Sequence, residues 1–549
     1  MGDSPMVPGA EGVGAAEPAA RDLPALLSGF AQRGERQALS FYRGRALEGR
    51  LSYAQLASRV AALASSLHGQ FGVKPGDRVA VLAPNRLEVP VLVLALLRLG
   101  AVVVPLNPGS APEDWTYVLE HSGASGLCAT RELAARVPAQ AGVRFTLPIE
   151  DAFVLTSSGV LPALPGDLGE HLAVVLYTSG TTGSPKGVAL RQRSCLANAA
   201  SMAARFHLAQ TTQLAVLPLY HAHAFGFGLM TALSTGGHLV FTERLEPFSW
   251  AHVIRAESVS VTSVVPTLLP MLLAAGVTAD KVPTLRHIMV SSAPLPAALA
   301  RDFEARSGVP LIQGWGLSEY TNFACCVSPY ASPEEHAALM FGREVPSVGA
   351  ALPGAEVRVV DARGAPAAEG EPGELVIRGP SCMLGYYRDP EATARALDAS
   401  GWLRSGDEGF FHVRGGRAVF FVSGRIKEII IRDAEKYSPL RLERRLAEAV
   451  PELAGKLVVL GFSHQEHGEE VGAYVEQAAL DAPLRARLLA AIEAMPLPER
   501  PKVVLHGERP IPRTHTGKIQ RRNMQPWFAA FGKHRGVVVI EALGSHAAP

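Results

Sequence analysis

The sequence predicts an α/β protein that carries a β-rich segment and a smaller α+β unit at its C-terminal end. Helical and strand patterns alternate over residues 23–106 and again over residues 213–312, which is typical of parallel sheets covered by helices. Between Ser347 and Phe421 the pattern changes to short strands with Gly and Pro turns, which indicates a β-rich subdomain. From about Lys427 a smaller α+β pattern follows. The chain has 549 residues, so roughly three to four folding units of ~150 residues are expected.

The N-terminal part shows one disordered stretch and one compact strand–helix–strand unit. Residues 1–22 are rich in Ala, Gly and Pro, and we predict that they are disordered. Ser52 and Gln55 predict a helix start, because an N-cap serine and a glutamine three residues later form a capping box. The apolar run over 89–106 could be mistaken for a membrane span, but Arg98 interrupts it. We therefore expect buried parallel strands there and no transmembrane segment.

The remaining elements are predicted from the same hydrophobic periodicities. Strands are expected over 78–82, 101–106, 173–176, 213–217, 237–241, 259–265, 286–290, 310–312, 356–361, 373–378, 406–413 and 418–422. Helices are expected over 87–99, 226–233, 250–257, 267–275 and 297–307.

Composition excludes several classes of protein. The formal net charge is +1, so nothing indicates binding to nucleic acid or to an anionic membrane surface. The chain has five cysteines, and the odd number without paired spacing argues against a disulfide framework or a zinc site. This cysteine usage favours a reducing cytosol. The first twenty residues lack the apolar core of a signal peptide, so a cytoplasmic protein is expected.

A loop rich in Gly, Ser and Thr runs from Tyr177 to Gly187, directly after the predicted strand 173–176. Its three glycines allow the backbone to approach a ligand closely, and successive N–H groups in such a loop form a nest that favours phosphate oxygens. Lys186 adds a positive charge. The loop is not a Walker loop, because Gly187 and not Ser or Thr follows the lysine. The sequence predicts a polyanion cradle, with a flexible linker as the alternative.

Four further segments carry residues suited to chemistry. His221 and His223 follow a strand, where ligands bind in open α/β sheets, but two histidines without a third ligand make a poor metal site. The alternative to a functional role is that these histidines are structural residues, with their hydrogen bonds satisfied within the fold. The other segments are a small-residue turn at 291–293, an aromatic–acidic stretch at 313–319 and a Ser-Gly-Asp turn that ends at Asp407. Taken alone, each of these three has an ordinary structural interpretation as a β–α turn, a core tryptophan or a surface turn.

Together these segments resemble the AMP-forming adenylating superfamily, which includes acyl- and aryl-CoA synthetases, peptide-synthetase adenylation domains and luciferases. The resemblance covers roughly residues 23–525 and includes the segments 401–407, 423–431 and 512–520. It implies a large N-terminal domain over 23–426, made of two helix-covered sheets and a β-rich subdomain. It also implies a small, mobile C-terminal domain over 427–549. ATP, Mg²⁺ and a carboxylic acid are the expected reactants, with an acyl-adenylate and pyrophosphate as the first products.

The resemblance implies a nucleotide site formed by many residues of the motifs. These are Thr178, Ser179, Gly180, Thr181, Thr182, Gly183, Lys186, Ser291, Ser292, Ala293, Gly314, Trp315, Gly316, Ser318, Asp407 and Arg425. Within this set, Trp315 would stack on adenine and Asp407 would accept hydrogen bonds from the ribose hydroxyls.

The implied catalytic residues are Lys518, Glu319, Ser318 and His221. Lys518 would bridge the attacking carboxylate and the α-phosphate, where negative charge builds up in the transition state. Glu319 would bind Mg²⁺, a cation that prefers oxygen ligands. Lys427 would be the hinge about which the small domain rotates. The implied substrate pocket contains His221, Phe225, Ser291, Gly316 and Phe323.

The acid and the acceptor are less narrowly indicated. Acetate-using members have a bulky aromatic residue at the place of Gly316, so we expect a medium-chain, long-chain or aryl acid, with an apolar acyl group. CoA is the expected thiol acceptor. Many members have glycines where this chain has Asp433 and Ala434, which makes the phosphopantetheine of a carrier protein a second candidate. The alternative outside enzymology is a non-catalytic nucleotide sensor, against which the retention of Lys518 argues.

Overall fold

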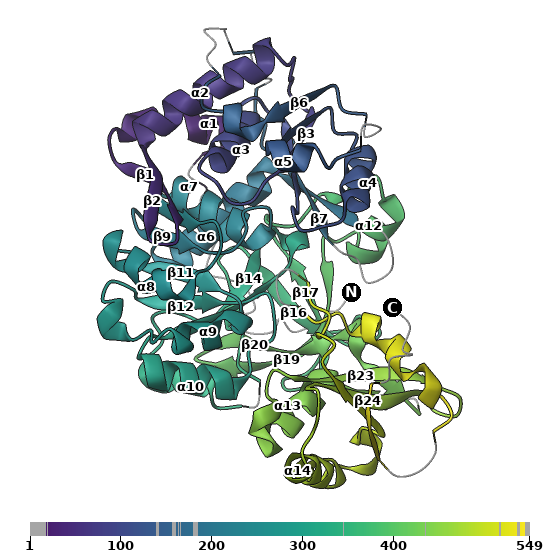
Figure 1. Ribbon diagram of the computed structural model, residues 1–549. Helices are drawn as coiled ribbons and strands as arrows, with labels where there is room; N and C mark the ends of the chain where they lie inside the picture. The colour runs from purple at the N-terminus through teal and green to yellow at the C-terminus, as the bar shows by residue number, and fades with distance from the viewer. Residues whose placement is uncertain are drawn as a thin grey trace, which may run out of the picture.

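The computed structural model describes residues 18, 20–138, 142–155, 161–162, 164, 166–178, 185–343, 345–433, 435–514, 518–534 and 538–543. These residues form a large N-terminal part and a smaller C-terminal part, which lies at the bottom of Figure 1 in green to yellow. The predicted α/β class is confirmed. Within the described residues, no helix is both long enough and apolar enough to cross a membrane.

The first large sheet has seven strands. The predicted phosphate-binding loop connects the second and third of them, counted from one edge. In spatial order the strands are β18 (Gly385–Tyr386), β8 (Lys186–Arg191), β7 (Leu172–Thr178), β4 (Val102–Leu106), β3 (Arg78–Leu82), β5 (Gly126–Ala129) and β6 (Phe145–Pro148). The strands from β7 to β6 are parallel, as expected of buried strands. After the loop, however, the chain returns as β8 antiparallel to β7, so the loop joins the two strands of a hairpin.

The second large sheet has nine strands and carries most of the other motifs. In spatial order they are β15 (Ala350–Ala351), β14 (Phe323–Cys326), β13 (Leu311–Gly316), β12 (His287–Val290), β11 (Val261–Val264), β9 (Thr212–Ala215), β10 (His238–Thr242), β1 (Gln37–Arg43) and β2 (Ala46–Ser52). The central pairs are parallel, whereas β14 pairs antiparallel with β13 and β15. The predicted strand 310–312 is thus extended to Gly316, which brings the aromatic–acidic stretch to the end of a strand.

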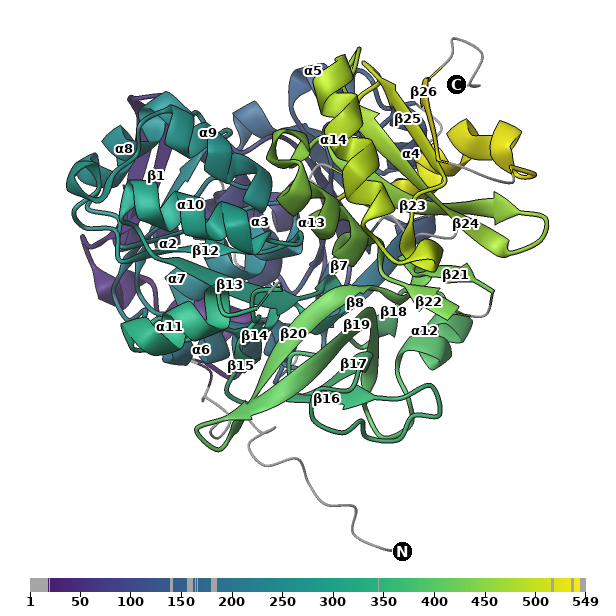
Figure 2. The same ribbon diagram turned by 90° about the horizontal axis from the view of Figure 1, so that it is seen from below.

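Helices cover both sheets, as Figures 1 and 2 show. They are α1 (Leu23–Ser28), α2 (Tyr53–Gly69), α3 (Glu88–Arg98), α4 (Pro112–Ser122), α5 (Arg131–Ala134), α6 (Gln192–Phe206), α7 (Thr231–Ser234), α8 (Pro247–Ala256), α9 (Leu269–Ala274), α10 (Ala297–Ser307), α11 (Pro333–Met340) and α12 (Pro390–Ala396). The capping box of α2 is present, with Ser52 and Gln55 in the predicted roles. Every residue of α3 from Val89 to Leu97 is buried, which explains its uniformly apolar sequence without a membrane.

The helix predicted over 226–233 differs from the structure. The chain forms a π-helical segment, Ala224–Met230, and only then one α-helical turn, α7. Gly226 packs against the Asn322 side chain so closely that an added Cβ would lie 2.9 Å from its Nδ2 atom. π-Helical segments occur frequently at functional sites, and this one follows the two histidines directly.

The β-rich subdomain is a four-stranded antiparallel sheet, visible on one side of the molecule in Figure 2. Its strands are β16 (Glu356–Val360), β17 (Gly373–Arg378), β19 (Leu403–Arg414) and β20 (Arg417–Arg425). The last two strands are longer than predicted, and their ladder pairs Asp407 directly with Arg425. Two residues that the sequence assigns to nucleotide binding are therefore held opposite each other by one hairpin.

The C-terminal part has its own sheet and its own hydrophobic clusters. The strands are β21 (Ile430–Arg432), β22 (Glu435–Tyr437), β23 (Leu457–His464), β24 (Gly468–Glu476), β25 (Val503–Gly507) and β26 (Val539–Ala542), and the helices are α13 (Pro439–Ala449) and α14 (Ala482–Glu493). The change of hydrophobic cluster between Phe421 and Ile430 supports the proposed domain boundary at 426/427. The tail beyond the superfamily resemblance supplies β26, which pairs with β25.

The predicted disordered segment, residues 1–22, overlaps at its end with the N-cap of the first helix of the large part. Residues 1–17 and 19 lie outside the described part of the chain. Asp22, in contrast, is buried, and its carboxylate accepts hydrogen bonds from the backbone of Ala25 and Leu168. Because it is the N-cap of α1 and ties this helix to a distant segment, Asp22 belongs to the folded domain.

Candidate active site

Trp315, Asp407 and Arg425 form one connected group at the end of β13 and on the β19–β20 hairpin. The indole N–H of Trp315 donates to Oδ2 of Asp407 at 2.8 Å, and Nε of Arg425 lies 3.3 Å from Oδ1. The Asp407 carboxylate raises the pKa of the Arg425 guanidinium. The structure thus brings the predicted adenine and ribose residues together. Their roles toward a nucleotide stay predictions, and the Asp407 oxygens keep lone pairs for further donors.

Glu319 and Lys186 are both in contact with Tyr386, a residue that the sequence interpretation missed. The phenol of Tyr386 donates to Oε1 of Glu319 at 2.9 Å. Nζ of Lys186 lies 5.0 Å from the centre of the Tyr386 ring, within the range of a cation–π contact. Glu319 follows β13 of the second sheet, whereas Lys186 and Tyr386 lie in neighbouring strands of the first. No local pattern around Gly385-Tyr386-Tyr387 indicates these contacts.

Lys518 comes from the C-terminal part and lies near the charged residues of the large part. Desolvation and the Arg425 guanidinium lower its pKa to about 8, while the carboxylates of Asp407, Glu319 and Glu428 act in the opposite direction. The backbone N–H of Lys518 donates to Oγ1 of Thr514. Lys518 thus interacts electrostatically with Glu319, Asp407 and Arg425 of the large part, and its catalytic role stays a prediction.

Arg521 fixes the segment that carries Lys518. Its buried guanidinium binds the carboxylates of Glu428 and Glu443, and its Nε donates to the Val459 carbonyl oxygen at 2.9 Å. Burial raises the pKa of Glu443, and Arg521 opposes that shift. Glu428 ends the short segment that contains the predicted hinge, Lys427, which is exposed. The hinge role of Lys427 itself stays a prediction.

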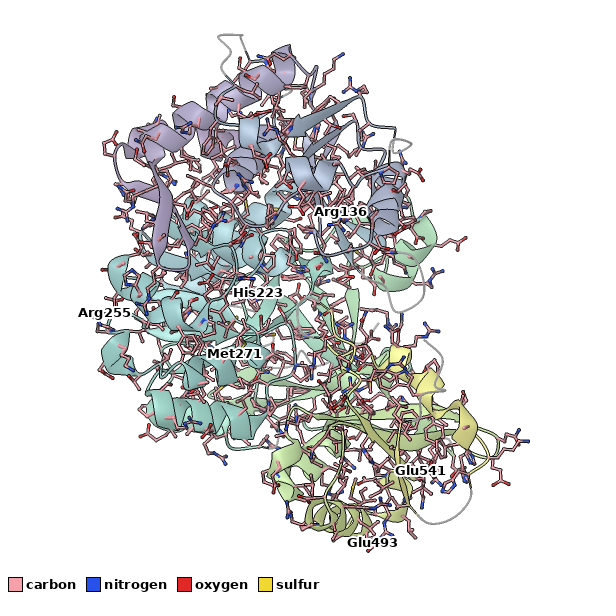
Figure 3. All side chains as sticks on the ribbon, in the orientation of Figure 1. Arg136, His223, Arg255, Met271, Glu493 and Glu541 are labelled. Carbon is pink, nitrogen blue, oxygen red and sulfur yellow. The ribbon has the colours of Figure 1, made fainter. Side chains whose placement is uncertain are left out.

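His223, and not only His221, is a candidate near the substrate. Nδ1 of His223 lies 3.0 Å from the Ser291 hydroxyl and 3.1 Å from the Ser292 hydroxyl. The ring is buried against Phe227 and Phe323, near the middle of the large part in Figure 3. Burial lowers the pKa of His223 to about 3, so the ring is neutral. Ser291 and Phe323, two of the predicted pocket residues, thus orient this histidine.

Backbone strain gathers around the same place. Ser292 has a φ of +69° and Thr321 a φ of +65°, although neither residue is a glycine. Ser292 lies two residues after the end of β12, and Thr321 lies two residues after Glu319. Both strained residues are therefore close in sequence to predicted site residues. Such outliers cost about 1–3 kcal/mol each and cluster at active and ligand-binding sites.

Gly316 has a packing role in this structure, and its role in opening the acyl pocket stays a prediction. A Cβ at Gly316 would lie 1.8 Å from the Asn322 carbonyl oxygen and 2.6 Å from Cα of Phe323. The glycine is required because β14 passes directly over it. Gly314 likewise faces the Phe323 ring and Cys326 at close range.

The phosphate loop is only partly described. Ser179, Gly180, Thr181, Thr182 and Gly183 lie outside the described residues, so their predicted contacts with phosphate are not addressed. Both ends of the loop are in place, with Thr178 ending β7 and Lys186 beginning β8. Next to Thr178, the phenol oxygen of Tyr177 lies 2.7 Å from Nδ1 of His121. The loop thus starts and ends on well-packed strands.

Four further predicted site residues lie in or next to the same elements. Ser318 begins the turn that holds Glu319, and Phe225 is buried in the π-helical segment. His221 contacts the Tyr220 ring. Ala293 follows the strained Ser292.

Comparison with known protein families matches residues 29–387 to the family described as AMP-binding enzyme. The chain belongs to this family. A sulfoacetate–CoA ligase of Cupriavidus necator is 31% identical over 495 residues, which are 86% of this chain and 91% of that protein. A feruloyl-CoA synthase of an Amycolatopsis species is 33% identical over 72% of this chain and 78% of that protein. The crystal structure of ATP-bound MatB from Rhodopseudomonas palustris superimposes with a TM-score of 0.81, at 26% identity, over 94% of this chain and 100% of that structure.

The residues of this AMP-binding enzyme fit a magnesium ion that arrives with a nucleotide. Among the described residues, no group of three or more His, Cys, Asp or Glu side chains could hold a metal ion alone. Mg²⁺ needs no such group, because it is commonly bound by one or two carboxylates together with substrate phosphates. Glu319 supplies a carboxylate whose Oε1 is fixed by Tyr386. Glu319 could therefore hold the ion together with ATP.

Asp433 departs from the superfamily pattern in an informative way. It has a φ of +52°, a conformation that glycine adopts more easily. Its carboxylate accepts a hydrogen bond from Nδ1 of His467 at 2.8 Å, and this histidine holds the pKa of Asp433 below its ordinary value. Ala434 lies outside the described residues. In this chain a side-chain contact with His467 thus accompanies the glycine-like backbone conformation of Asp433.

Proposed function

We propose that this AMP-binding enzyme is an acid–thiol ligase that activates a carboxylic acid with ATP and passes the acyl group to CoA. One observation carries the proposal: the ammonium of Lys518, from the C-terminal part, interacts electrostatically with Glu319, Asp407 and Arg425 of the large part. A protein that only binds a nucleotide has no need for an ammonium group at that place. The relatives named as CoA ligases support CoA as the acceptor.

In the first half-reaction the acid carboxylate attacks the α-phosphorus of ATP, and the bond to pyrophosphate breaks. The Lys518 ammonium stabilises charge on the attacking carboxylate and on the α-phosphate. Lys186 stabilises the departing phosphates, and Arg425, held by Asp407, stays charged beside them. Mg²⁺, when bound with ATP, supplies neutralising charge for the phosphate oxygens. The remaining contribution is orientation of the two reactants.

In the second half-reaction the CoA thiol attacks the acyl carbonyl, a thioester forms and AMP leaves. For this step we propose that the domain 427–549 turns about Lys427 and carries Lys518 away from the site. Lys427 lies in a single short turn between β20 and β21, a location typical of hinges. The five unpaired cysteines support a cytoplasmic location.

The acid is proposed to be medium-chain, long-chain or aryl. We propose that its pocket is lined by His221, Phe225, Ser291, Gly316 and Phe323. Both phenylalanines are buried, and the Phe323 ring packs edge-on against His223. A carrier protein with a phosphopantetheine arm is the second acceptor.

The test is ATP–pyrophosphate exchange with a panel of carboxylic acids. Thioester assays follow, with CoA and with a carrier protein that bears a free phosphopantetheine thiol. We expect exchange with a subset of larger apolar acids, weak exchange with acetate, and thioester formation with CoA. If the protein binds ATP but shows no exchange with any acid, the alternative of a non-catalytic nucleotide sensor would be favoured. Transfer only to the carrier protein would change the acceptor and leave the adenylation step intact.

The alkaline pH dependence of the first half-reaction is expected to follow Lys518. Because the pKa of Lys518 is lowered to about 8, its ammonium is lost at a lower pH than that of an ordinary lysine, near 10.4. The kcat/KM for exchange should therefore fall roughly tenfold per pH unit above pH 8. Lys518→Arg keeps its charge over this range and should lose the alkaline limb, whatever its absolute rate. An unchanged limb in this variant would assign the titration to another group.

A further inference from the structure

We propose that Tyr386 is a positioning residue for the phosphate and metal end of the site, because it holds the Glu319 carboxylate on its hydroxyl and the Lys186 ammonium on its ring. The inference rests on the proposed function, since it concerns the same site. It adds a residue that neither the sequence motifs nor the family assignment indicates.

Tyr386 connects the two large sheets at the point where their motifs meet. Its phenol donates to Glu319, which follows β13, while Tyr386 itself lies in β18 at the edge of the other sheet. The backbone of Glu319 is tied to the same segment, because its carbonyl oxygen accepts from the Met383 N–H at 2.8 Å.

The backbone around Tyr386 is fixed from two sides. Its N–H donates to Oγ1 of Thr393 at 2.8 Å, and its residue pairs with Val188 in the β8–β18 ladder. A Cβ at the preceding Gly385 would lie 2.7 Å from the Thr393 methyl group, so this position has no room for a side chain. The ring therefore stands at a defined place beside Lys186, which begins β8.

This arrangement keeps two opposite charges available to a ligand. A lysine and a glutamate that face one site attract each other, and a direct pair would occupy both groups. Here each charged group contacts a different part of the same tyrosine, the carboxylate its hydroxyl and the ammonium its ring. Lys186 is thereby left for phosphate oxygens, and the carboxylate keeps lone pairs for a metal ion.

The test measures Mn²⁺ binding by electron paramagnetic resonance, with the full-length protein and a non-hydrolysable ATP analogue. Tyr386→Phe removes the hydroxyl and keeps the ring, so the Mn²⁺ affinity should fall roughly tenfold, the size expected for a hydrogen bond to a charged group. The affinity for the analogue without metal should be unchanged. Tyr386→Leu removes the ring as well and should weaken analogue binding in addition.

Two controls separate positioning from general loss of structure. Tyr42→Phe deletes a comparable phenol–carboxylate bond, 2.6 Å to Glu257, in β1 at the far side of the second sheet, and should leave Mn²⁺ affinity unchanged. In a Glu319→Gln background, Tyr386→Phe should have little further effect on Mn²⁺ affinity. Equal Mn²⁺ affinity in wild type and Tyr386→Phe would overturn the inference, as would an undiminished effect in the Glu319→Gln background. If the wild type itself fails to bind the analogue, the proposed function fails instead.

Discussion

Lys518→Ala is expected to lower the rate of adenylate formation by at least about 10²–10³-fold, the loss typical of removing one preorganised electrostatic contact to a transition state. The reason is that Lys518 is the cation that the C-terminal part places near Glu319, Asp407 and Arg425. Thioester formation from supplied acyl-adenylate and CoA should stay near the wild-type rate. Both rates are measured on the same preparation, by pyrophosphate exchange and by CoA-thioester formation.

The matched control is Lys456→Ala, which removes an exposed lysine of the same C-terminal part, in the turn before β23. It should leave both half-reactions unchanged. If Lys518→Ala lost both half-reactions to the same extent, Lys518 would be needed throughout and the proposed rotation about Lys427 would be refuted.

Arg521→Met is expected to destabilise the C-terminal part by roughly 3–5 kcal/mol, the cost of breaking a buried ion pair by removing one partner. The substitution leaves Glu443 in a buried place, where desolvation already raises its pKa. A group whose pKa is raised in the folded state favours folding when it is protonated. The loss should therefore shrink as the pH is lowered from 7 toward 5. Hydrogen exchange of the β23 and β24 amides in the full chain measures the free energy of opening.

Two further variants test whether the buried charge of Glu443 causes this loss. Adding Glu443→Gln to Arg521→Met removes the uncompensated charge and should restore much of the lost free energy. Arg487→Met breaks an exposed ion pair with Glu452 and should cost at most about 1 kcal/mol. A similar cost for Arg487→Met and Arg521→Met would show that burial of the Arg521 network contributes nothing. Because Arg521→Met destabilises the whole C-terminal part, it should impair both half-reactions, unlike Lys518→Ala.

Local sequence patterns predicted the elements whose ends are encoded nearby. The helix over 297–307 is observed with the predicted bounds, because Gly308 ends it in the left-handed conformation that glycine favours. The π-helical form of 224–230 was not predictable in this way, since it follows from the contact between Gly226 and the distant Asn322. Hydrophobic periodicity depends on residues that are close in sequence. The contact of Gly226 with Asn322 joins residues that are far apart in sequence, so periodicity does not reveal it.

The candidate site shows the same division. Asp407, Arg425 and Lys518 could be predicted because each lies in a short motif with a recognisable turn. Tyr386 could not, because its value depends on Glu319 and Lys186, which belong to two different sheets. Gly316 has a second reason to be a glycine that the motif does not reveal, because its close contact with Asn322 and Phe323 depends on the position of β14.

The pairing of Asp407 with Arg425 across β19 and β20 also bears on the order in which the protein acquires its site. A hairpin closes a short loop, so its contacts form quickly and at little entropic cost. Lys518 follows β20 by about a hundred residues, in a part of the chain with its own hydrophobic clusters. A nascent chain that ends shortly after β20 would thus already contain the hairpin with Asp407 and Arg425, while the segment with Lys518 is still to be synthesised.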